Sequence, residues 1–419
     1  MTNGNVADGE LLLPEQTRLV HIGPPKTGTS SLQGAFHTCR AATEAQGVHY
    51  AGQRRHSGSA VQAVTARPGF FTDGAPPPIS EWRHLTSDAR RSKWKRVVVS
   101  SEFFADALPE SLPRIVEDLG GDRVHVVVTL RPLAKIIPSQ WQQYVQSGMR
   151  VSYSRWLDAM LKGPPGKLTP TFWRRHRHDE LVARWAAVVG PERMTVIALD
   201  DRDRDMVLRV FEGLTGLRAG TLVAPPELAN RSMTLPEIEA IRAFNTAFKE
   251  EGLRPALLSK VMHFGAATYM RQREPDPDEP RLETPSWALE PVHAVAREMI
   301  DNISASGVRI VGDLEILTLV PERGGSDDQA AQATVPPDIA ASMAMGVLFS
   351  SGLARRPDPA GPGSSWKPDL SRLMPMFSEP LETTRLPTRQ LVGIVLRRAR
   401  VALAKRWLLL TRRDPGTSD

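Results

Sequence analysis

The sequence predicts an α/β fold, namely a doubly wound parallel sheet flanked by helices, with a mostly helical C-terminal extension. Two observations predict it. Segments rich in β-branched apolar residues alternate with segments of helical periodicity, and this alternation is typical of parallel sheets. The strand-like segments are apolar at consecutive positions, as expected where helices cover both faces of a sheet. They span residues 18–23, 96–101, 124–130 and 194–199.

Helices are predicted between and after these strands. The first helix follows the first strand directly, because Leu32 and Phe36 have the i, i+4 spacing of one helix face. From residue 235 onward the pattern is mainly helical, and Pro236 and Pro285 mark helix starts. Further helices are predicted at residues 111–119, 138–147, 179–189 and 203–214.

Changes in composition divide the chain into four segments. Residues 15–250 form the α/β core, and residues 251–320 are a helical continuation of the same domain. Residues 321–388 are a linker rich in Gly and Pro that contains a helix, and residues 389–412 are a basic amphipathic helix. Two interpretations of this last helix stay open: peripheral contact with an anionic membrane surface, or packing of its apolar face on the protein.

The composition is that of an ordinary soluble globular protein, with 41% hydrophobic and 24% charged residues among 419. The formal net charge of +6 favours an anionic partner, such as a nucleotide, a sulfated or phosphorylated ligand, or a membrane surface. The single cysteine, Cys39, excludes an intramolecular disulfide and a cysteine-based zinc site. Neither a signal peptide nor a long apolar segment is evident, so a cytoplasmic location is expected, with peripheral membrane contact through the last helix as the open alternative.

The most informative segment, residues 21–31, reads HIGPPKTGTSS and joins the first strand to the first helix. Glycines let backbone N–H groups turn toward an anion, and the start of a helix adds donors and partial positive charge. Lys26 adds a full charge, and Thr27, Thr29 and Ser30 add hydroxyls. This pattern predicts a phosphate-binding loop. It departs from the nucleoside-triphosphatase loop, because Thr29 stands where that loop has its lysine.

Residues 25–30, with the sequence PKTGTS, resemble the 5′-phosphosulfate-binding loop of the sulfotransferases that use 3′-phosphoadenosine 5′-phosphosulfate (PAPS). That loop reads approximately P-K-[ST]-G-T-[ST], and every position matches. The resemblance implies a P-loop-type fold, PAPS as co-substrate and no metal. It also implies that the 5′-phosphosulfate is held by Lys26, Thr27, Gly28, Thr29 and Ser30.

The same family has a second signature, in which a strand ends in Arg and a Ser follows eight residues later. Here Arg131 ends the strand at 124–130 and Ser139 stands eight residues on. The resemblance implies that these two side chains bind the 3′-phosphate, which a guanidinium can bind bidentately. Pro132 departs from the family pattern, in which the proline comes one residue later. Pro138 suits the first position of a helix, which would place Ser139 in its first turn.

Two side chains are candidates for the base that takes the acceptor proton. Glu102 directly follows the strand at 96–101, where carboxyl ends of parallel strands face the ligand crevice. The family has its catalytic His or Glu at this place, so the resemblance implies that Glu102 is the base. His56 is the second candidate, because histidine titrates near neutral pH. Lys26 is a catalytic candidate as well, since it would absorb charge on the leaving phosphate. His176 and His178 lie in a basic run interpreted as a solvated helix face.

The resemblance implies transfer of a sulfuryl group from PAPS to a hydroxyl or amine of a carbohydrate, a glycolipid or a small molecule. Trp141, Tyr144 and Trp173 are expected near the acceptor, and no nucleic-acid partner is expected. Two other functions stay open. A P-loop kinase using ATP and Mg²⁺ is disfavoured by the displaced lysine and by the lack of an Asp at the ends of two central strands. The other is a non-catalytic protein that binds a nucleotide or docks on a membrane.

Overall fold

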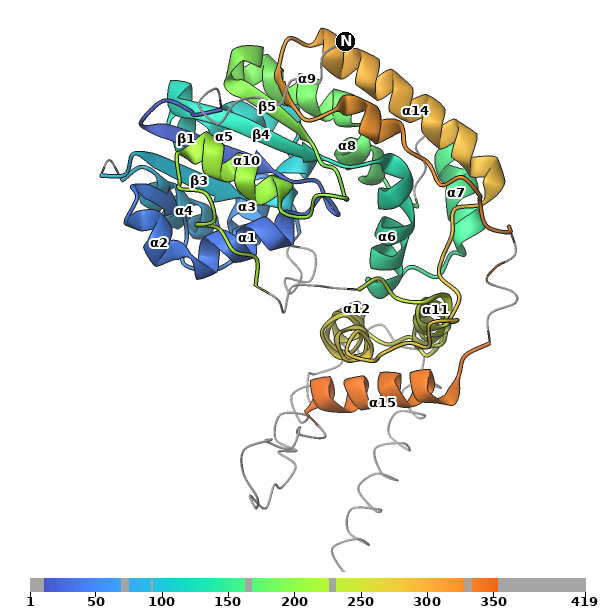
Figure 1. Ribbon diagram of the computed structural model, residues 1–419. Helices are drawn as coiled ribbons and strands as arrows, with labels where there is room; N and C mark the ends of the chain where they lie inside the picture. Colours follow the sequence, from blue (N-terminus) through green and yellow to red (C-terminus); the bar gives the residue numbers. More distant parts are fainter. Residues whose placement is uncertain are drawn as a thin grey trace, which may run out of the picture. The chain divides into compact units, whose positions relative to one another are not determined.

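The computed structural model describes residues 11–68, 75–91, 93–162, 168–225, 231–327, 329 and 334–352. Its central element is one parallel sheet with the strand order β2-β3-β1-β4-β5-β6 (Figure 1). The predicted α/β class with a parallel sheet is thus confirmed. The strands are β1 (Thr17–Ile22), β2 (Val48–Tyr50), β3 (Arg96–Ser100), β4 (Val124–Leu130), β5 (Met194–Ala198) and β6 (Arg309–Val311).

The four strands predicted from the sequence are the central ones, β1, β3, β4 and β5. The two edge strands, β2 and β6, have three residues each and are too short to give a periodic signal. β1 lies between β3 and β4, so the chain runs outward from β1 in both directions. In such a sheet, ligands bind in the crevice beyond the carboxyl ends of the strands that flank this reversal.

Helices cover both faces of the sheet (Figure 1). Val20 and Ile22 face an apolar layer formed with helices α3, α4, α5 and α9, whereas Leu19 faces the layer formed with α1 and α10. The α-helices are α1 (Thr29–Thr38), α2 (Arg40–Glu44), α3 (Gly58–Val64), α4 (Ile79–Ala89), α5 (Leu112–Leu119), α6 (Leu133–Gln146), α7 (Tyr153–Leu161), α8 (Phe172–His176), α9 (His178–Val189), α10 (Met206–Thr215), α11 (Leu235–Glu250), α12 (Pro255–Leu258), α13 (Ala267–Met270), α14 (Ser286–Ala305) and α15 (Pro337–Ser351).

Short helical turns complete the described chain. The turn η1 is the important one for the site, because it starts directly after β3 and carries Glu102 at its first position. The 3-10 turns are η1 (Glu102–Asp106), η2 (Pro109–Ser111), η3 (Gly121–Arg123), η4 (Pro191–Arg193) and η7 (Leu314–Thr318), and the segment Ser259–Ala266 is a π-helix.

A second apolar core is built only from helices. It joins α6, α7 and α8 to α11, α13, α14 and α15, and it contains Trp141 and Trp156 with no exposed surface. The mostly helical extension predicted after residue 250 is confirmed. Trp141 was expected near the acceptor, but its ring is buried in this core and its Nε1 donates to Val151 O. Its apolar surface stabilises the helical layer instead.

The prediction that a helix begins at Pro138 is wrong. Helix α6 begins at Leu133, and Pro132 is its N-cap residue. Pro138 therefore lies inside the helix, where it removes one backbone hydrogen bond. Burial of Ile136, Ile137 and Trp141 on the same helix offsets this loss. Ser139 consequently lies in the second turn of α6 rather than in the first.

Two sequence-based expectations fall on residues outside the described ranges. These are the basic helix at 389–412 and most of the loop at 163–170, which was expected to cover the acceptor site. Helix α15 lies within the predicted linker at 321–388. Within the described part of the chain, none of the helices is both long and apolar enough to cross a membrane.

Candidate anion-binding and catalytic site

The loop between β1 and α1 has the conformation of an anion cradle. Lys26 and Gly28 both adopt left-handed backbone angles, with φ of 76° and 79°. This conformation is strained for lysine, and strain of this kind clusters at functional sites. Gly23 is required by close packing, because a Cβ there would lie 1.9 Å from Thr29 Oγ1. Helix α1 begins at Thr29, so its first backbone N–H groups have no acceptor within the helix.

The hydroxyls of Thr27 and Thr29 hold the loop together instead of facing the expected phosphates. Thr29 Oγ1 donates to Gly23 O at 3.0 Å, and Thr27 Oγ1 donates to Pro24 O at 2.8 Å. Both side chains are buried, whereas Ser30 is exposed. Because each hydroxyl has one proton, neither threonine side chain can also donate to a ligand in this arrangement. The loop therefore offers an anion its backbone N–H groups, Lys26 and Ser30.

A chain of buried hydrogen bonds anchors this loop on the sheet. Thr27 Oγ1 contacts Thr129 Oγ1 at 3.0 Å, and Thr129 contacts His21 Nε2 at 3.1 Å. Since the Thr27 proton goes to Pro24 O, Thr129 must donate to Thr27 and accept from His21 Nε2. His21 Nδ1 then accepts from Ser100 Oγ at 2.8 Å. Burial lowers the pKa of His21 to about 3, which agrees with a neutral ring in this chain.

The same chain continues to both candidate bases through Gln33 on α1. Gln33 Nε2 donates to Ser100 Oγ at 3.3 Å and, at 3.5 Å, to Glu102 Oε2. Its Oε1 accepts from His56 Nδ1 at 2.6 Å, and His56 Nε2 accepts from Arg55 Nε at 2.8 Å. The structure thus brings Glu102 and His56 to one place, although sequence reasoning could not locate His56. Gln33 was missed because glutamine on a helix carries no distinctive pattern.

His56 is held as a neutral ring. Burial among neighbouring protein atoms lowers the pKa of His56. The negative charge of Glu102 raises this pKa and the positive charge of Arg55 lowers it further, and the net shift is downward. Both ring nitrogens already have partners, with Nδ1 as donor and Nε2 as acceptor. Glu102 is half-buried at the start of η1. Of the two side chains, Glu102 has the carboxylate oxygens available to accept a proton from a ligand.

Three cationic side chains converge at the mouth of the loop. Lys26 is solvent-accessible but surrounded by protein; desolvation, Arg271 and Arg131 together lower its pKa to about 8. Desolvation also lowers the pKa of Arg271, and the Arg231 charge adds to this effect. Like charges that lie close together disfavour each other's charged forms, and a bound anion relieves this effect. Arg271 follows α13, far from the loop in the sequence, and no sequence signal identifies it.

Arg131, which the second signature predicts as a 3′-phosphate ligand, lies against the loop and is paired with a carboxylate. Its Nη1 donates to Lys26 O at 3.0 Å, and its Nη2 is 2.5 Å from Asp201 Oδ1. Lys135 Nζ is 2.7 Å from the other oxygen of Asp201. Burial alone would raise the pKa of Asp201, but hydrogen bonds from Arg131 and Lys135 outweigh it and lower the pKa.

A pocket of about 310 Å³ lies beside this pair. Gly28 and Arg131 line it on the side of the phosphate loop, and three aspartates line it on the other side. Ser139 is half-buried on α6 and does not line this pocket, so the structure does not place it beside Arg131 there. The lining residues are Gly28, Ser31, Arg131, Leu199, Asp200, Asp201, Asp203, Arg204 and Val207.

His176 and His178 do not lie on a solvated helix face, contrary to the sequence-based interpretation. Both rings are fully buried. Burial lowers the pKa of His178 to about 4 and lowers that of His176 well below its usual value. They contribute to the packing of α8 and α9, because His176 contacts the ring of Phe172.

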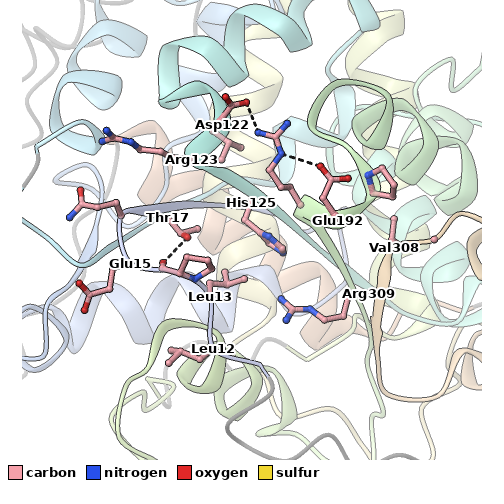
Figure 2. Close-up of a pocket in the computed structure, with 16 residues that line it drawn as sticks. Leu12, Leu13, Glu15, Thr17, Asp122, Arg123, His125, Glu192, Val308 and Arg309 are labelled. Carbon is pink, nitrogen blue, oxygen red and sulfur yellow. Dashed lines mark hydrogen bonds and ion pairs between the residues drawn. The ribbon is translucent and has the colours of Figure 1, made fainter.

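A larger pocket, of about 540 Å³, lies at the opposite end of the sheet (Figure 2). It is formed where β1 and β4 begin, with Thr17 and His125 in its wall. Arg193 in this pocket is paired with Asp122 at 2.9 Å and with Glu192 at 3.6 Å. None of the residues predicted to form the site lines it.

Comparisons with known proteins found similarity among solved structures alone. No protein-family model and no curated protein matches the chain. Among solved structures, the chain is similar to the crystal structure of a sulfotransferase from Alicyclobacillus acidocaldarius, with 18% sequence identity and a TM-score of 0.35. The match covers 57% of this chain and 96% of the other chain. Similarity this weak does not assign a function.

Metal coordination was also considered. Among the residues that the structure describes, no group of three or more His, Cys, Asp or Glu side chains could hold a metal ion. The charged groups that act on Lys26 are the cations Arg271 and Arg131, and Arg131 is itself paired with Asp201. The arrangement can therefore bind a polyanion and place it near a carboxylate, Glu102.

Proposed function

We propose that the protein is a sulfotransferase that takes a sulfuryl group from PAPS and transfers it to a hydroxyl or amine. The observation that carries this proposal is the strained loop at Lys26, against which Arg131 lies with its Nη1 donating to Lys26 O at 3.0 Å, and Arg271 adds a third positive charge that acts on Lys26. The loop sequence, which resembles that of PAPS-dependent enzymes, supports the choice of donor.

The donor has two charged ends, and the site has cations for both. The loop N–H groups, Lys26 and Ser30 would hold the 5′-phosphosulfate. Arg131 would bind the 3′-phosphate from the neighbouring pocket, where that phosphate would compete with Asp201 for the guanidinium. Arg271 would add charge on the side of Lys26. Ser139 remains a prediction for the 3′-phosphate.

In the proposed reaction the acceptor oxygen or nitrogen attacks sulfur in line with the bond to the 5′-phosphate. A bond from the acceptor to sulfur forms, and the bond between sulfur and the phosphate oxygen breaks. The products are the sulfated acceptor and 3′,5′-bisphosphoadenosine. Glu102 takes the acceptor proton, and Lys26 with the loop N–H groups stabilises charge on the leaving phosphate.

Glu102 is preferred over His56 as the base for a geometric reason. His56 already donates from Nδ1 and accepts at Nε2, so it has no free lone pair in this arrangement. Glu102 receives only a long contact from Gln33, at 3.5 Å. His56 and Gln33 are then positioning residues, because Gln33 contacts Glu102 and His56 donates a hydrogen bond to Gln33.

The test compares nucleotides by isothermal titration calorimetry. We expect 3′,5′-bisphosphoadenosine with a chelator present to bind at least about tenfold more tightly than ATP with Mg²⁺, since only the first carries the 3′-phosphate. Arg131→Ala should remove most of this difference. Arg193→Ala, in the pocket at the other end of the sheet, is the matched control and should bind like the wild type.

A transfer assay with ³⁵S-labelled PAPS and a panel of hydroxyl and amine compounds then tests the chemistry. Transfer that persists with a chelator supports the proposal. Tighter binding of ATP with strict dependence on Mg²⁺ would instead identify a kinase. Binding of bisphosphoadenosine without transfer to any compound of the panel would favour a non-catalytic nucleotide-binding protein.

A further inference from the structure

Four arginines surround one buried carboxylate at the far end of the turn that carries Glu102. The carboxylate is Asp106, which is 3% exposed at the last position of η1. The arginines come from three parts of the chain: the end of α3, helix α8 and helix α9. They are Arg67, Arg174, Arg175 and Arg184.

Only one of these arginines is bound to the carboxylate through its side chain. Arg175 forms a bidentate pair with Asp106, with Nε donating to Oδ1 at 2.7 Å. Arg67 donates to the backbone oxygen of Asp106, at 3.5 Å. Arg184 donates to Ala105 O at 3.2 Å and to Arg174 O at 3.1 Å. The cluster therefore contains four positively charged side chains and one negatively charged side chain, Asp106.

Two guanidinium nitrogens of the cluster are buried and have no hydrogen-bond partner, namely Arg174 Nη1 and Arg184 Nε. An unpaired buried donor costs about 1–3 kcal/mol, and more when it is charged. Desolvation lowers the pKa of both side chains; Arg67 adds to the effect on Arg174, and Arg174 adds to that on Arg184. All four arginines are half-buried residues, between the interior and the surface.

The cluster is adjacent to the proposed catalytic base. Glu102 and Asp106 are the first and last residues of η1, and a 3-10 helix rises about 2 Å per residue, so roughly 8 Å separates them. The charge of Asp106 acts most strongly on Arg175, and the negative charge of Glu102 also reaches it. An acceptor that presents its hydroxyl to Glu102 would therefore extend toward the arginines.

We propose that Arg67, Arg174 and Arg184 form an acceptor subsite for an oxyanion, so that the natural acceptor carries a carboxylate, sulfate or phosphate in addition to the group that is sulfated. Guanidinium groups match these planar or tetrahedral oxyanions with paired N–H donors. This inference rests on the proposed function, because it concerns the acceptor of that reaction. Arg175 is excluded from the ligand set, since it is already paired with Asp106.

The first experiment uses inorganic sulfate on protein saturated with 3′,5′-bisphosphoadenosine, so that the phosphate loop is already occupied. We expect sulfate to raise the melting temperature relative to sodium chloride of the same ionic strength. The double variant Arg174→Gln/Arg184→Gln should lose most of this increase. Arg297→Gln, which removes an exposed guanidinium paired with Glu315, is the matched control and should keep it.

The second experiment measures transfer to matched pairs of acceptors that differ in charge, namely methyl glucoside against methyl glucuronide and phenol against 4-hydroxybenzoate or 4-hydroxyphenyl phosphate. We expect kcat/KM to be at least about tenfold higher for the anionic members, because charged hydrogen bonds contribute about 1.5–3 kcal/mol. The double variant should reduce this ratio to about one, mainly through a higher KM for the anionic members. Comparison of carboxylate with phosphate shows which oxyanion is preferred.

The outcomes separate the two proposals. Equal use of neutral and anionic acceptors, or a double variant that behaves like Arg297→Gln in both experiments, overturns the subsite while the sulfotransferase assignment stands. Failure to bind bisphosphoadenosine overturns the proposed function before either experiment on the subsite begins. A double variant that melts well below the wild type without sulfate would show that the arginines mainly stabilise η1, and Arg174→Gln alone then decides the acceptor ratio.

Discussion

The two ends of the sheet differ in how their charges are compensated. The pocket at the amino ends of the strands is the larger, at about 540 Å³ against 310 Å³, but two of the guanidiniums that line it have partners. Arg193 pairs with Asp122 and Glu192, and Arg309 donates to Thr195 Oγ1. At the carboxyl ends, Lys26 and Arg271 have cations as their charged neighbours. The size of a cavity is therefore a poor guide here, and uncompensated charge is a better one.

Backbone strain distinguishes the two ends of the sheet only when the charge of the strained side chain is considered as well. Three non-glycine residues among those that the structure describes lie in the left-handed region, namely Gln16 at the amino end, Lys26 at the carboxyl end and Ala66 after α3. Gln16 closes a turn, and its N–H donates to Lys95 O at 2.6 Å. Lys26 places a charged side chain in a crevice that a substrate can enter. Backbone strain that positions a charged side chain is typical of functional sites, and of these residues Lys26 is the charged one.

The largest expected effect is on turnover. Glu102→Gln keeps the shape of the side chain but cannot accept a proton, so we expect turnover to fall by about 10² or more while affinity for bisphosphoadenosine stays unchanged. Steady-state transfer assays and calorimetry measure the two quantities. Glu192→Gln, at the amino end, should change neither. Retained turnover in Glu102→Gln would transfer the role of base to His56 or to the acceptor itself.

Charge removal at the loop should have the next largest effect. Lys26→Met and Arg131→Ala should each weaken binding of bisphosphoadenosine by about 10–100-fold, since a hydrogen bond to a charged group contributes about 1.5–3 kcal/mol. Arg131→Ala should hardly affect a ligand without the 3′-phosphate, such as ADP. Equal losses for both ligands would mean that Arg131 does not bind the 3′-phosphate.

The affinity for bisphosphoadenosine should depend on pH through Lys26. The pKa of Lys26 is lowered to about 8 in the free protein, and a bound anion favours its charged form. Affinity should therefore be constant below pH 8 and fall as pH rises above it, by up to about tenfold per pH unit until the level of Lys26→Met is reached. Calorimetry from pH 6.5 to 9.5 measures this, and the variant should show a flat profile. A parallel decline in Lys26→Met would assign the titration to another group.

The smallest expected effect is an increase in affinity. Asp201 forms an ion pair with Arg131, and a bound 3′-phosphate would compete with it for the guanidinium. Asp201→Asn should therefore strengthen binding of bisphosphoadenosine by about two- to fivefold, the range of a partly exposed ion pair. Asp122→Asn removes the equivalent pair with Arg193 at the other end and should leave the affinity unchanged. Weaker binding in Asp201→Asn would mean that this carboxylate positions Arg131 for the ligand.

Sequence patterns were sufficient for the central strands and for the loop because their signals are local. The strands β1, β3, β4 and β5 are apolar runs long enough to recognise, whereas β2 and β6 have three residues each and pair only because a neighbouring strand is present. The start of α6 was misplaced for a related reason. Pro138 has the local preference of a first helical residue, and the packing of Ile137 and Trp141 overrides that preference.

By itself, the sequence determined the α/β class, the position of the phosphate loop and the placement of Glu102 after β3, because periodicity, glycine spacing and strand ends are properties of short segments. The tertiary structure decided what surrounds them. It directed the hydroxyls of Thr27 and Thr29 into the loop, and it brought Arg271 to Lys26 and His56 to Gln33. These contacts join residues far apart in the chain, and their geometry depends on how whole helices pack, which no short pattern encodes.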